Sequence, residues 1–271
     1  MGEWKVLNAR ITFFTVGPVS SSDQSALSVY RQFWEADPDS FQKQPNPLAP
    51  SMAQGRRGGL LAACTVNPTR TDLNLAAADT DVQGPHPTLS LIEDAGQLRV
   101  ELTRITDAVG RGVISRALNR VALYVQFVAT KPTLLAVNKT LMSIIPDGYR
   151  PNLTDEESFI FQINRPQVLP DVEQLRMNYI TKWSAESIRV VTMLLPRDPA
   201  VRMGPPNIGS PIFGEFLAAS LSFDINNVPA PKPLTPPQQS SLLLNGMAWA
   251  AETQRTCGLN IEGFDSVNRL E

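Results

Sequence analysis

Histidine and cysteine are almost absent from this sequence. Its 271 residues include one histidine, His86, and two cysteines, Cys64 and Cys257. A single histidine excludes a zinc site built on several histidines and a two-histidine iron site. The two cysteines match neither a metal-ligand nor a redox spacing, and Cys64 falls in an apolar run that is typical of a buried free thiol. The sequence therefore predicts no bound metal and no cofactor.

Long hydrophobic segments are missing as well. No stretch approaches the ~20 continuous apolar residues of a membrane span. Residues 1–6, MGEWKV, lack the basic flank and the apolar run of a signal peptide. Hydrophobic residues make up 42% of the chain, charged residues 18%, and the net charge is -2, which is the composition of a globular protein with a sizeable core. We expect a cytoplasmic protein that does not contact a membrane.

Proline, by contrast, is abundant. The 23 prolines cluster at four places in the chain, residues 45–50, 85–87, 196–211 and 229–237. They punctuate the sequence and form no single low-complexity tract. The first and third clusters fall in predicted loops at 37–59 and 196–211, which are longer than simple connections need. Long loops on a rigid scaffold commonly carry binding residues.

The segment from Asn119 to Val128 is the longest run of β-favouring residues without glycine or proline. Val121, Leu123, Val125 and Phe127 share one face of the predicted strand, while Ala122, Tyr124, Gln126 and Val128 share the other. Because both faces are largely apolar, the pattern predicts a central strand covered on both sides. An amphipathic stripe precedes it at Leu91, Ala95, Leu98, Leu102, Ile105 and Val109. We expect this helix, at about 89–109, to pack on a face of the sheet that contains residues 121–128.

The remaining elements are predicted from alternation, caps and turns. Strands are expected at 4–16, 60–66, 71–75, 159–164, 177–183, 188–195 and 217–225, with 177–183 and 188–195 joined near residues 184–186. Ser21 and Gln24 have capping-box spacing before a first helix, and Asn138 is expected to cap a short helix that ends at Ile145. Thr235, Pro236 and Gln238 begin a last helix that reaches about residue 256.

Consecutive runs of strands favour one fold class. We expect an α+β fold with a mostly antiparallel twisted sheet and two or three longer helices packed on it. Residues 1–271 are predicted to form a single domain, because both halves of the chain need the central strand. The alternative is a subdivision near 131–137, where Lys131-Pro132 follows that strand.

Three function classes fit the residues that are present. A metal-dependent hydrolase or nuclease could use carboxylates; its candidates are Asp72, Asp79, Asp81, Glu93, Asp155, Glu156 and Glu157. An anion or nucleic-acid binder could use a local arginine patch; its candidates are Arg56, Arg57, Arg111, Arg116 and Arg120. The net charge of -2 counts against a broad nucleic-acid surface. The third class is a non-catalytic binding or assembly subunit.

We favour the third class, a protein that works through protein–protein contacts. The catalytic spacings of a nucleophile, a phosphate loop or a carboxylate metal site are not found in the sequence. Phe41, Arg56, Arg57 and Phe213 lie in or beside the long proline-bound loops. Aromatic and arginine side chains together are the composition favoured at interface centres. These four residues are the predicted contacts with a protein partner.

Overall fold

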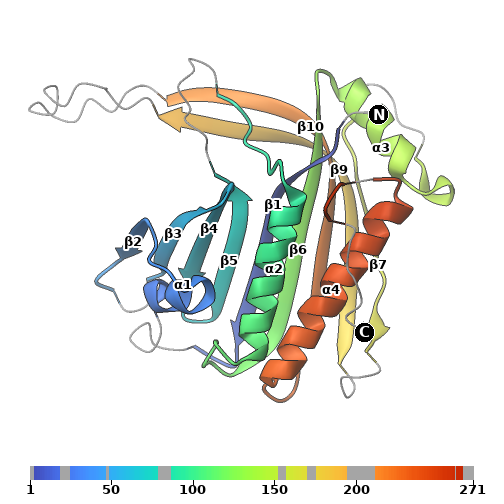
Figure 1. The fold of residues 1–271 in the computed structure, drawn as a ribbon. Helices are drawn as coiled ribbons and strands as arrows, with labels where there is room; N and C mark the ends of the chain where they lie inside the picture. Colours follow the sequence, from blue (N-terminus) through green and yellow to red (C-terminus); the bar gives the residue numbers. More distant parts are fainter. Residues whose placement is uncertain are drawn as a thin grey trace, which may run out of the picture.

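A large antiparallel sheet forms the frame of the molecule. The computed structural model describes residues 3–18, 25–46, 49–78, 87–151, 157–169, 175–193, 211–259 and 261–264. Within them, ten strands form one sheet with the order β2-β3-β4-β5-β1-β6-β10-β9-β7, and β8 also pairs with β9 (Figure 1). Four α-helices accompany the sheet. The predicted α+β class, with an antiparallel sheet and packed helices, is confirmed.

The bounds of the elements are as follows. The strands are β1 Lys5–Thr15, β2 Ser40–Lys43, β3 Ser51–Arg57, β4 Leu60–Val66, β5 Arg70–Ala77, β6 Leu118–Lys131, β7 Ile160–Asn164, β8 Gln167–Val168, β9 Arg176–Met193 and β10 Pro211–Asn227. The helices are α1 Ala26–Trp34, α2 Ala95–Gly110, α3 Leu134–Ile144 and α4 Pro236–Thr256, and Asp147–Tyr149 forms the 3-10 turn η1.

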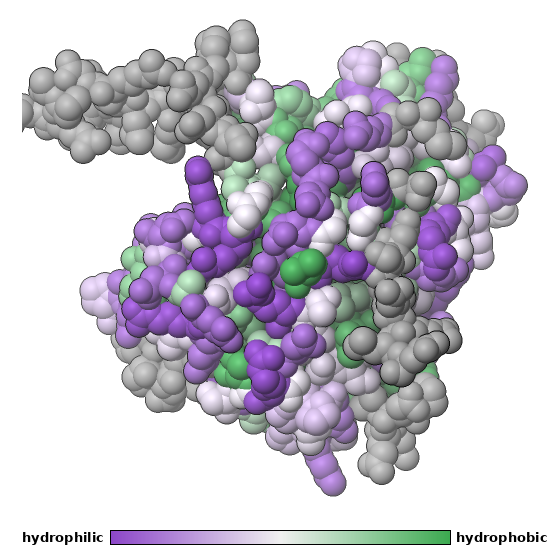
Figure 2. Space-filling view, viewed as in Figure 1, coloured by the Kyte–Doolittle hydropathy of each residue, from purple (hydrophilic) through white to green (hydrophobic). Residues whose placement is uncertain are grey.

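Strand β6 is central, as expected, because it pairs with β1 on one side and with β10 on the other. Its odd-numbered residues from Val121 to Phe127 belong to one core cluster with Leu98, Leu102 and Ile105 of α2. Figure 1 shows α2 and α4 side by side across this face of the sheet. The predicted packing of the striped helix on the sheet is therefore confirmed. The outward surface of this helical layer is mainly hydrophilic (Figure 2), as amphipathic helices require.

The helix starts follow local capping chemistry, although two predicted caps are wrong. Helix α1 begins after Ser25, whose side chain accepts from the Ser28 backbone N–H, so the cap is not Ser21. Helix α3 begins after Thr133, and Asn138 lies inside it and donates to the Glu157 carbonyl. Threonine at the N-cap satisfies the first free backbone N–H groups, which leaves Asn138 available for a tertiary contact.

The other two helices differ from each other in how well they were predicted. Helix α4 begins after Thr235 with the predicted capping box to Gln238. Helix α2 begins only at Ala95, after the N-cap Asp94, and not near residue 89. The chain before it is extended, and the Ile92 N–H donates to the Val6 carbonyl at 2.9 Å. This bridge to β1 overrides the helical periodicity at Leu91.

The predicted loop at 37–59 is wrong, because it contains β2 and β3. Ser51, Ala53 and Gly55 alternate as buried residues along β3, and α1 packs on this side. A Cβ at Gly55 would lie 2.5 Å from the Tyr30 hydroxyl, so only glycine lets the helix come this close. The prolines hid the hairpin because they lie in the connection between its two strands.

The predicted turn near residues 184–186 is also wrong. Residues 177–183 and 188–195 do not form two strands, because β9 runs from Arg176 to Met193 without a break. It pairs residue for residue with β10, and Ser184 faces Ser220 within this ladder. Pairing with β10 along the whole of β9, and with β7 on its other edge, keeps the small polar residues extended. The hairpin of β4 and β5 is confirmed, and so is a strand at 217–225. Its burial is not one-sided, because Ala218, Ser220 and Ser222 are buried as well.

Within the described ranges, no helix is long and apolar enough to cross a membrane. The division of the chain into one or two domains stays a prediction.

Candidate functional site

The second face of the sheet is where polar side chains gather. We call it the open face: it carries the residues that alternate with the core residues, including Arg10, Thr12, Tyr124, Gln126 and Asp224. The core cluster takes residues from all four α-helices, yet it excludes Val128 and Ala218, which are buried on the open face. The second face of β6 is nearly covered, as expected: Val128 is 0% and Gln126 8% exposed, and Ala122 and Tyr124 are half-buried. Neighbouring polar side chains bond one another across this face and shield its few apolar residues.

Three arginines surround a small depression on the open face. Register places Arg70 of β5 and Arg120 of β6 on either side of Phe14 in β1. Four residues back along β1, Arg10 lies opposite Tyr124. The depression has a volume of about 80 Å³ and is lined by Arg10, Thr12, Phe14, Arg70, Arg120, Ala122, Tyr124 and Asp224. We call it the arginine hollow. Its central pair, Thr12 and Ala122, consists of small residues, which leaves room between the arginines.

Two of the arginines rest on aromatic rings. The Arg10 guanidinium carbon lies 5.5 Å from the centroid of the Tyr124 ring, and that of Arg120 lies 5.0 Å from the centroid of Phe14. Both distances are within the range of a cation–π interaction. The Arg120 Nε is buried and has no hydrogen-bond partner within the described part of the chain. Stacking holds the two guanidinium groups in place while leaving their N–H edges for a ligand.

The third arginine is neutralised. Arg70 Nε lies 2.9 Å from Asp72 Oδ2, and Thr12 Oγ1 donates to Asp72 Oδ1 at 2.7 Å. Asp72 is buried, and these two contacts satisfy its carboxylate. At the rim, Asp224 accepts from Asn226 at 2.9 Å. Neither Arg10 nor Arg120 forms an ion pair with any residue that the structure describes.

Tyr124 forms one wall of the arginine hollow. Burial raises the pKa of its phenol above the ordinary value of 10.0, while a side-chain hydrogen bond with Ser222 and the nearby Arg10 act in the opposite direction. The phenol is therefore neutral at physiological pH, and its ring serves as a platform for Arg10.

A second polar cluster lies further along the open face. Gln126 Nε2 donates to Glu186 Oε2 at 2.8 Å and to Ser220 Oγ at 3.1 Å, which joins β6 to β9 and β10. Ser184 Oγ donates to Glu186 Oε1 at 2.7 Å, and Lys182 lies 3.4 Å from the same oxygen. Ser184 is fully buried, so no substrate reaches it. These hydrogen bonds fix the side chains of this part of the open face.

The four predicted contact residues lie on two separate parts of the sheet. Phe41 is 39% exposed on the edge strand β2, and Phe213 is 69% exposed on β10 beyond its last pair with β6. Arg56 and Arg57 end β3, so they do not form a phosphate-binding loop. The Arg57 guanidinium lies 5.4 Å from the Tyr30 ring. Their part in a protein contact stays a prediction.

Only one of the five predicted anion-binding arginines reaches the arginine hollow. Arg120 lies there, whereas Arg111 ends α2 and Arg116 is buried with a donation to the Asn67 carbonyl at 3.0 Å. Arg10 and Arg70 were missed, because sequence reasoning followed arginines that are neighbours in the chain. Residues two apart in a strand share a face, so a strand at 4–16 implies that Arg10 and Thr12 lie together. The strand register is needed to bring Arg70 and Arg120 to them.

The carboxylate candidates that lie in the described residues do not form a metal site. Across the described ranges, no group of three or more histidine, cysteine, aspartate or glutamate side chains is placed to hold a metal ion. Asp72 pairs with Arg70, and Glu93 accepts from Lys5 at 2.6 Å. Glu157 is exposed. The other candidates, Asp79, Asp81, Asp155 and Glu156, lie outside the described residues, as does His86.

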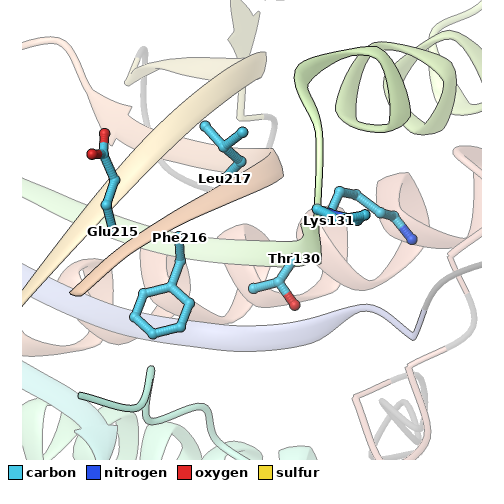
Figure 3. A pocket seen from close by; sticks show the side chains of 6 residues that line it. Thr130, Lys131, Glu215, Phe216 and Leu217 are labelled. Atoms are coloured by element: carbon cyan, nitrogen blue, oxygen red, sulfur yellow. The ribbon is translucent and has the colours of Figure 1, made fainter. Parts of the chain in front are cut away.

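A larger cavity of about 720 Å³ lies where β6 leaves β10. It is lined by Thr130, Lys131, Pro132, Glu215, Phe216 and Leu217. Figure 3 shows that these side chains do not converge: Glu215 and Leu217 point to one side of β10, whereas Phe216 and Thr130 point to the other. The cavity lacks a set of polar groups aimed at one point, which a small-molecule site requires.

Comparison of the chain with models of protein families, with curated proteins and with solved structures finds no match. The functional argument therefore rests on the geometry of the open face.

Proposed function

We propose that this is a non-catalytic binding protein, and that it contacts a protein partner through the open face of its sheet. The observation that carries the proposal is the cross-strand fixation of this face. Its polar side chains are held by one another before any partner arrives, which lowers the entropy cost of binding.

An amide ladder is the clearest example of this fixation. Asn164 of β7 donates to Asn178 of β9 at 3.4 Å, and Asn178 donates to Asn226 of β10 at 3.2 Å. Asn226 in turn donates to Asp224 at the rim of the arginine hollow. The ladder joins three strands and orients a carboxylate. A surface that served only for solubility would not need such an ordered arrangement.

The composition of the open face also supports a contact function. Arginine and tyrosine are enriched at the energetic centres of protein interfaces, and both lie at the arginine hollow. The catalytic alternative gains no support from the described candidates, because Asp72 pairs with Arg70 and Glu93 with Lys5. The arginine-patch alternative becomes part of the proposal, because arginines on the open face would contact the partner.

Site-specific photo-cross-linking in the native extract tests the proposal. The cross-linker replaces Asn74 of β5, which lies on the open face opposite Arg10, or Gln162 of β7, and neither residue lines the hollow. The matched controls replace Val100 of α2 and Leu244 of α4, which are 50% and 45% exposed on the helical side. We expect one protein to be captured from both open-face positions and from neither control.

Two outcomes contradict the proposal. One is capture of the same protein from the helical positions alone. The other is catalysis: purified protein that hydrolyses a phosphoester, at a rate abolished by Glu93→Gln, would be a carboxylate enzyme.

A further inference from the structure

We infer that the arginine hollow binds a single oxyanion, a phosphate or carboxylate group carried by a side chain of the protein partner. The inference rests on the proposed function, because it names the group by which the open face recognises that partner. It is carried by the two stacked arginines, by the unpaired nitrogen of Arg120 and by the space between them.

The hollow has the size and the donors for one such group. Its volume of about 80 Å³ exceeds the ~30 Å³ that one water molecule occupies in the liquid and falls well short of the ~300 Å³ of a typical small-molecule pocket. Arginine guanidinium groups match the oxygens of carboxylate and phosphate through paired N–H donors. Arg10 and Arg120 approach from two strands and lie on opposite sides of the small pair Thr12 and Ala122.

The charge balance within the hollow favours an anion. Arg70 and Asp72 neutralise each other, and Asp224 contributes one negative charge at the rim. Arg10 and Arg120 contribute two positive charges, so the lining has a surplus of cation. The buried Arg120 Nε carries a hydrogen that no described residue accepts. A buried donor without a partner destabilises the free protein, and an oxyanion in the hollow would supply the missing acceptor.

The surroundings of the hollow favour one anionic group over a polyanion. Asp224 lies at the rim, and Glu186 lies further along the same face, on β9. A nucleic-acid backbone that tracked across the sheet would pass these carboxylates and be repelled. The net charge of -2 gives no general attraction to nucleic acid either. A single charged side chain on a protein partner avoids this repulsion.

The test uses the purified full chain with inorganic phosphate, acetate and chloride at matched ionic strength. Thermal melting and phosphorus NMR are measured for the wild type, Arg10→Gln, Arg120→Gln and the control Arg31→Gln. Arg31 is an exposed arginine of α1 that pairs with Asp37 at 2.6 Å. Arg31→Gln therefore removes one positive charge, as the two hollow variants do, but on the helical side of the sheet. Arg120→Lys is the second variant of the site, because it keeps the charge and loses the guanidinium fork.

We expect phosphate or acetate to raise the melting temperature more than chloride does, by mass action on the folded state. Each glutamine variant at the hollow should weaken this binding by about tenfold or more, the effect of losing one charge-assisted pair. Arg31→Gln should bind as the wild type does. Preference for phosphate over acetate identifies a phosphorylated side chain, and the reverse preference identifies an aspartate or glutamate.

Three results would overturn the inference. The first is that phosphate and acetate raise the melting temperature of a cooperatively melting wild type no more than chloride does. The second is equal weakening in Arg31→Gln, and the third is unchanged binding in both glutamine variants. Tighter binding of an oligothymidylate than of phosphate at the hollow would show that the partner is a nucleic acid. If cross-links still map to the open face while phosphate and acetate fail, the inference falls and the proposed function stands.

Discussion

The two faces of β6 differ in chemistry, although their residues alternate along the same strand. Val125 and Phe127 face the helices and are fully buried in the apolar core. Tyr124 and Gln126, one position away from them, face the open side and bond to polar partners on β10 and β9. The helical face gains its stability from apolar area removed from water, and the open face gains order from directed hydrogen bonds. The difference shows how one sheet can supply an apolar core on one face and an ordered polar surface on the other.

Among the tests that compare the two faces, a charge placed in the helical layer should have the largest effect on stability. Leu102→Asp buries an unpaired carboxylate between α2 and the sheet, because Leu102 is 1% exposed. We expect a loss of stability of about 4 kcal/mol or more, enough to abolish a cooperative melting transition in a marginally stable chain. Circular dichroism during heating measures the transition.

Val100→Asp is the matched control for this substitution. It lies two residues earlier on the same helix and is 50% exposed. The control should change stability by no more than about 0.5 kcal/mol. If Leu102→Asp melts like Val100→Asp, the packing of α2 on the sheet is wrong.

A pair of neighbouring alanine substitutions on β6 compares the two faces directly. Phe127→Ala leaves a cavity beside the rings of Phe223 and Phe264, which lie 5.7 and 5.4 Å away between centroids. Its expected cost is about 3–5 kcal/mol. Gln126→Ala removes hydrogen bonds to Glu186 and Ser220, at an expected cost of about 1–2 kcal/mol.

Denaturant unfolding of the two alanine variants gives the ratio of these costs. A larger loss for Gln126→Ala would mean that the open face, and not the apolar core, dominates stability.

The smallest expected effect is on the stability of the folded protein at alkaline pH, where Tyr124 of the open face titrates. Burial raises the pKa of Tyr124 in the folded chain above its ordinary value of 10.0. The folded chain therefore holds the phenol proton more tightly than the unfolded chain does. This contribution to stability is complete below about pH 10 and is lost as pH rises through the folded-state pKa.

Tyr124→Phe should remove this alkaline loss. At about pH 8 the variant should lie within about 1 kcal/mol of the wild type, since it loses only the hydrogen bond with Ser222. Unfolding midpoints measured between about pH 8 and pH 11 should fall less steeply for the variant. Parallel curves for the two proteins would mean that Tyr124 is as solvated in the folded chain as in the unfolded one.

Local chemistry made several elements readable from the sequence. Thr235 and Gln238 form the predicted capping box of α4, and the alternation in 217–225 correctly marks a strand, although Ser220 and Ser222 on its polar face are buried too. The repeat from Leu98 to Val109 correctly marks the buried stripe of α2. Each pattern depends on groups within a turn or two of chain, so no distant partner is needed to interpret it.

Elements that depend on a distant partner were misjudged. Prolines suggested a loop at 37–59, but β4 and α1 hold residues 51–57 as a buried strand. Small polar residues suggested a break at Ser184, but the ladder with β10 keeps β9 continuous. In both places the hydrogen bonds and contacts that decide the conformation come from residues far away in the chain.

The sequence by itself determined the fold class, the central strand, the striped helix and the last helix, because local periodicity and capping specify which residues face a core. It also placed Arg10 and Thr12 on the same side of β1. Only the tertiary structure decided that Arg10, Arg70 and Arg120 surround one hollow. Strand order and register bring these three residues together from β1, β5 and β6. Strand register depends on how all the strands of the sheet pair, so no local sequence pattern predicts that these three arginines lie close together.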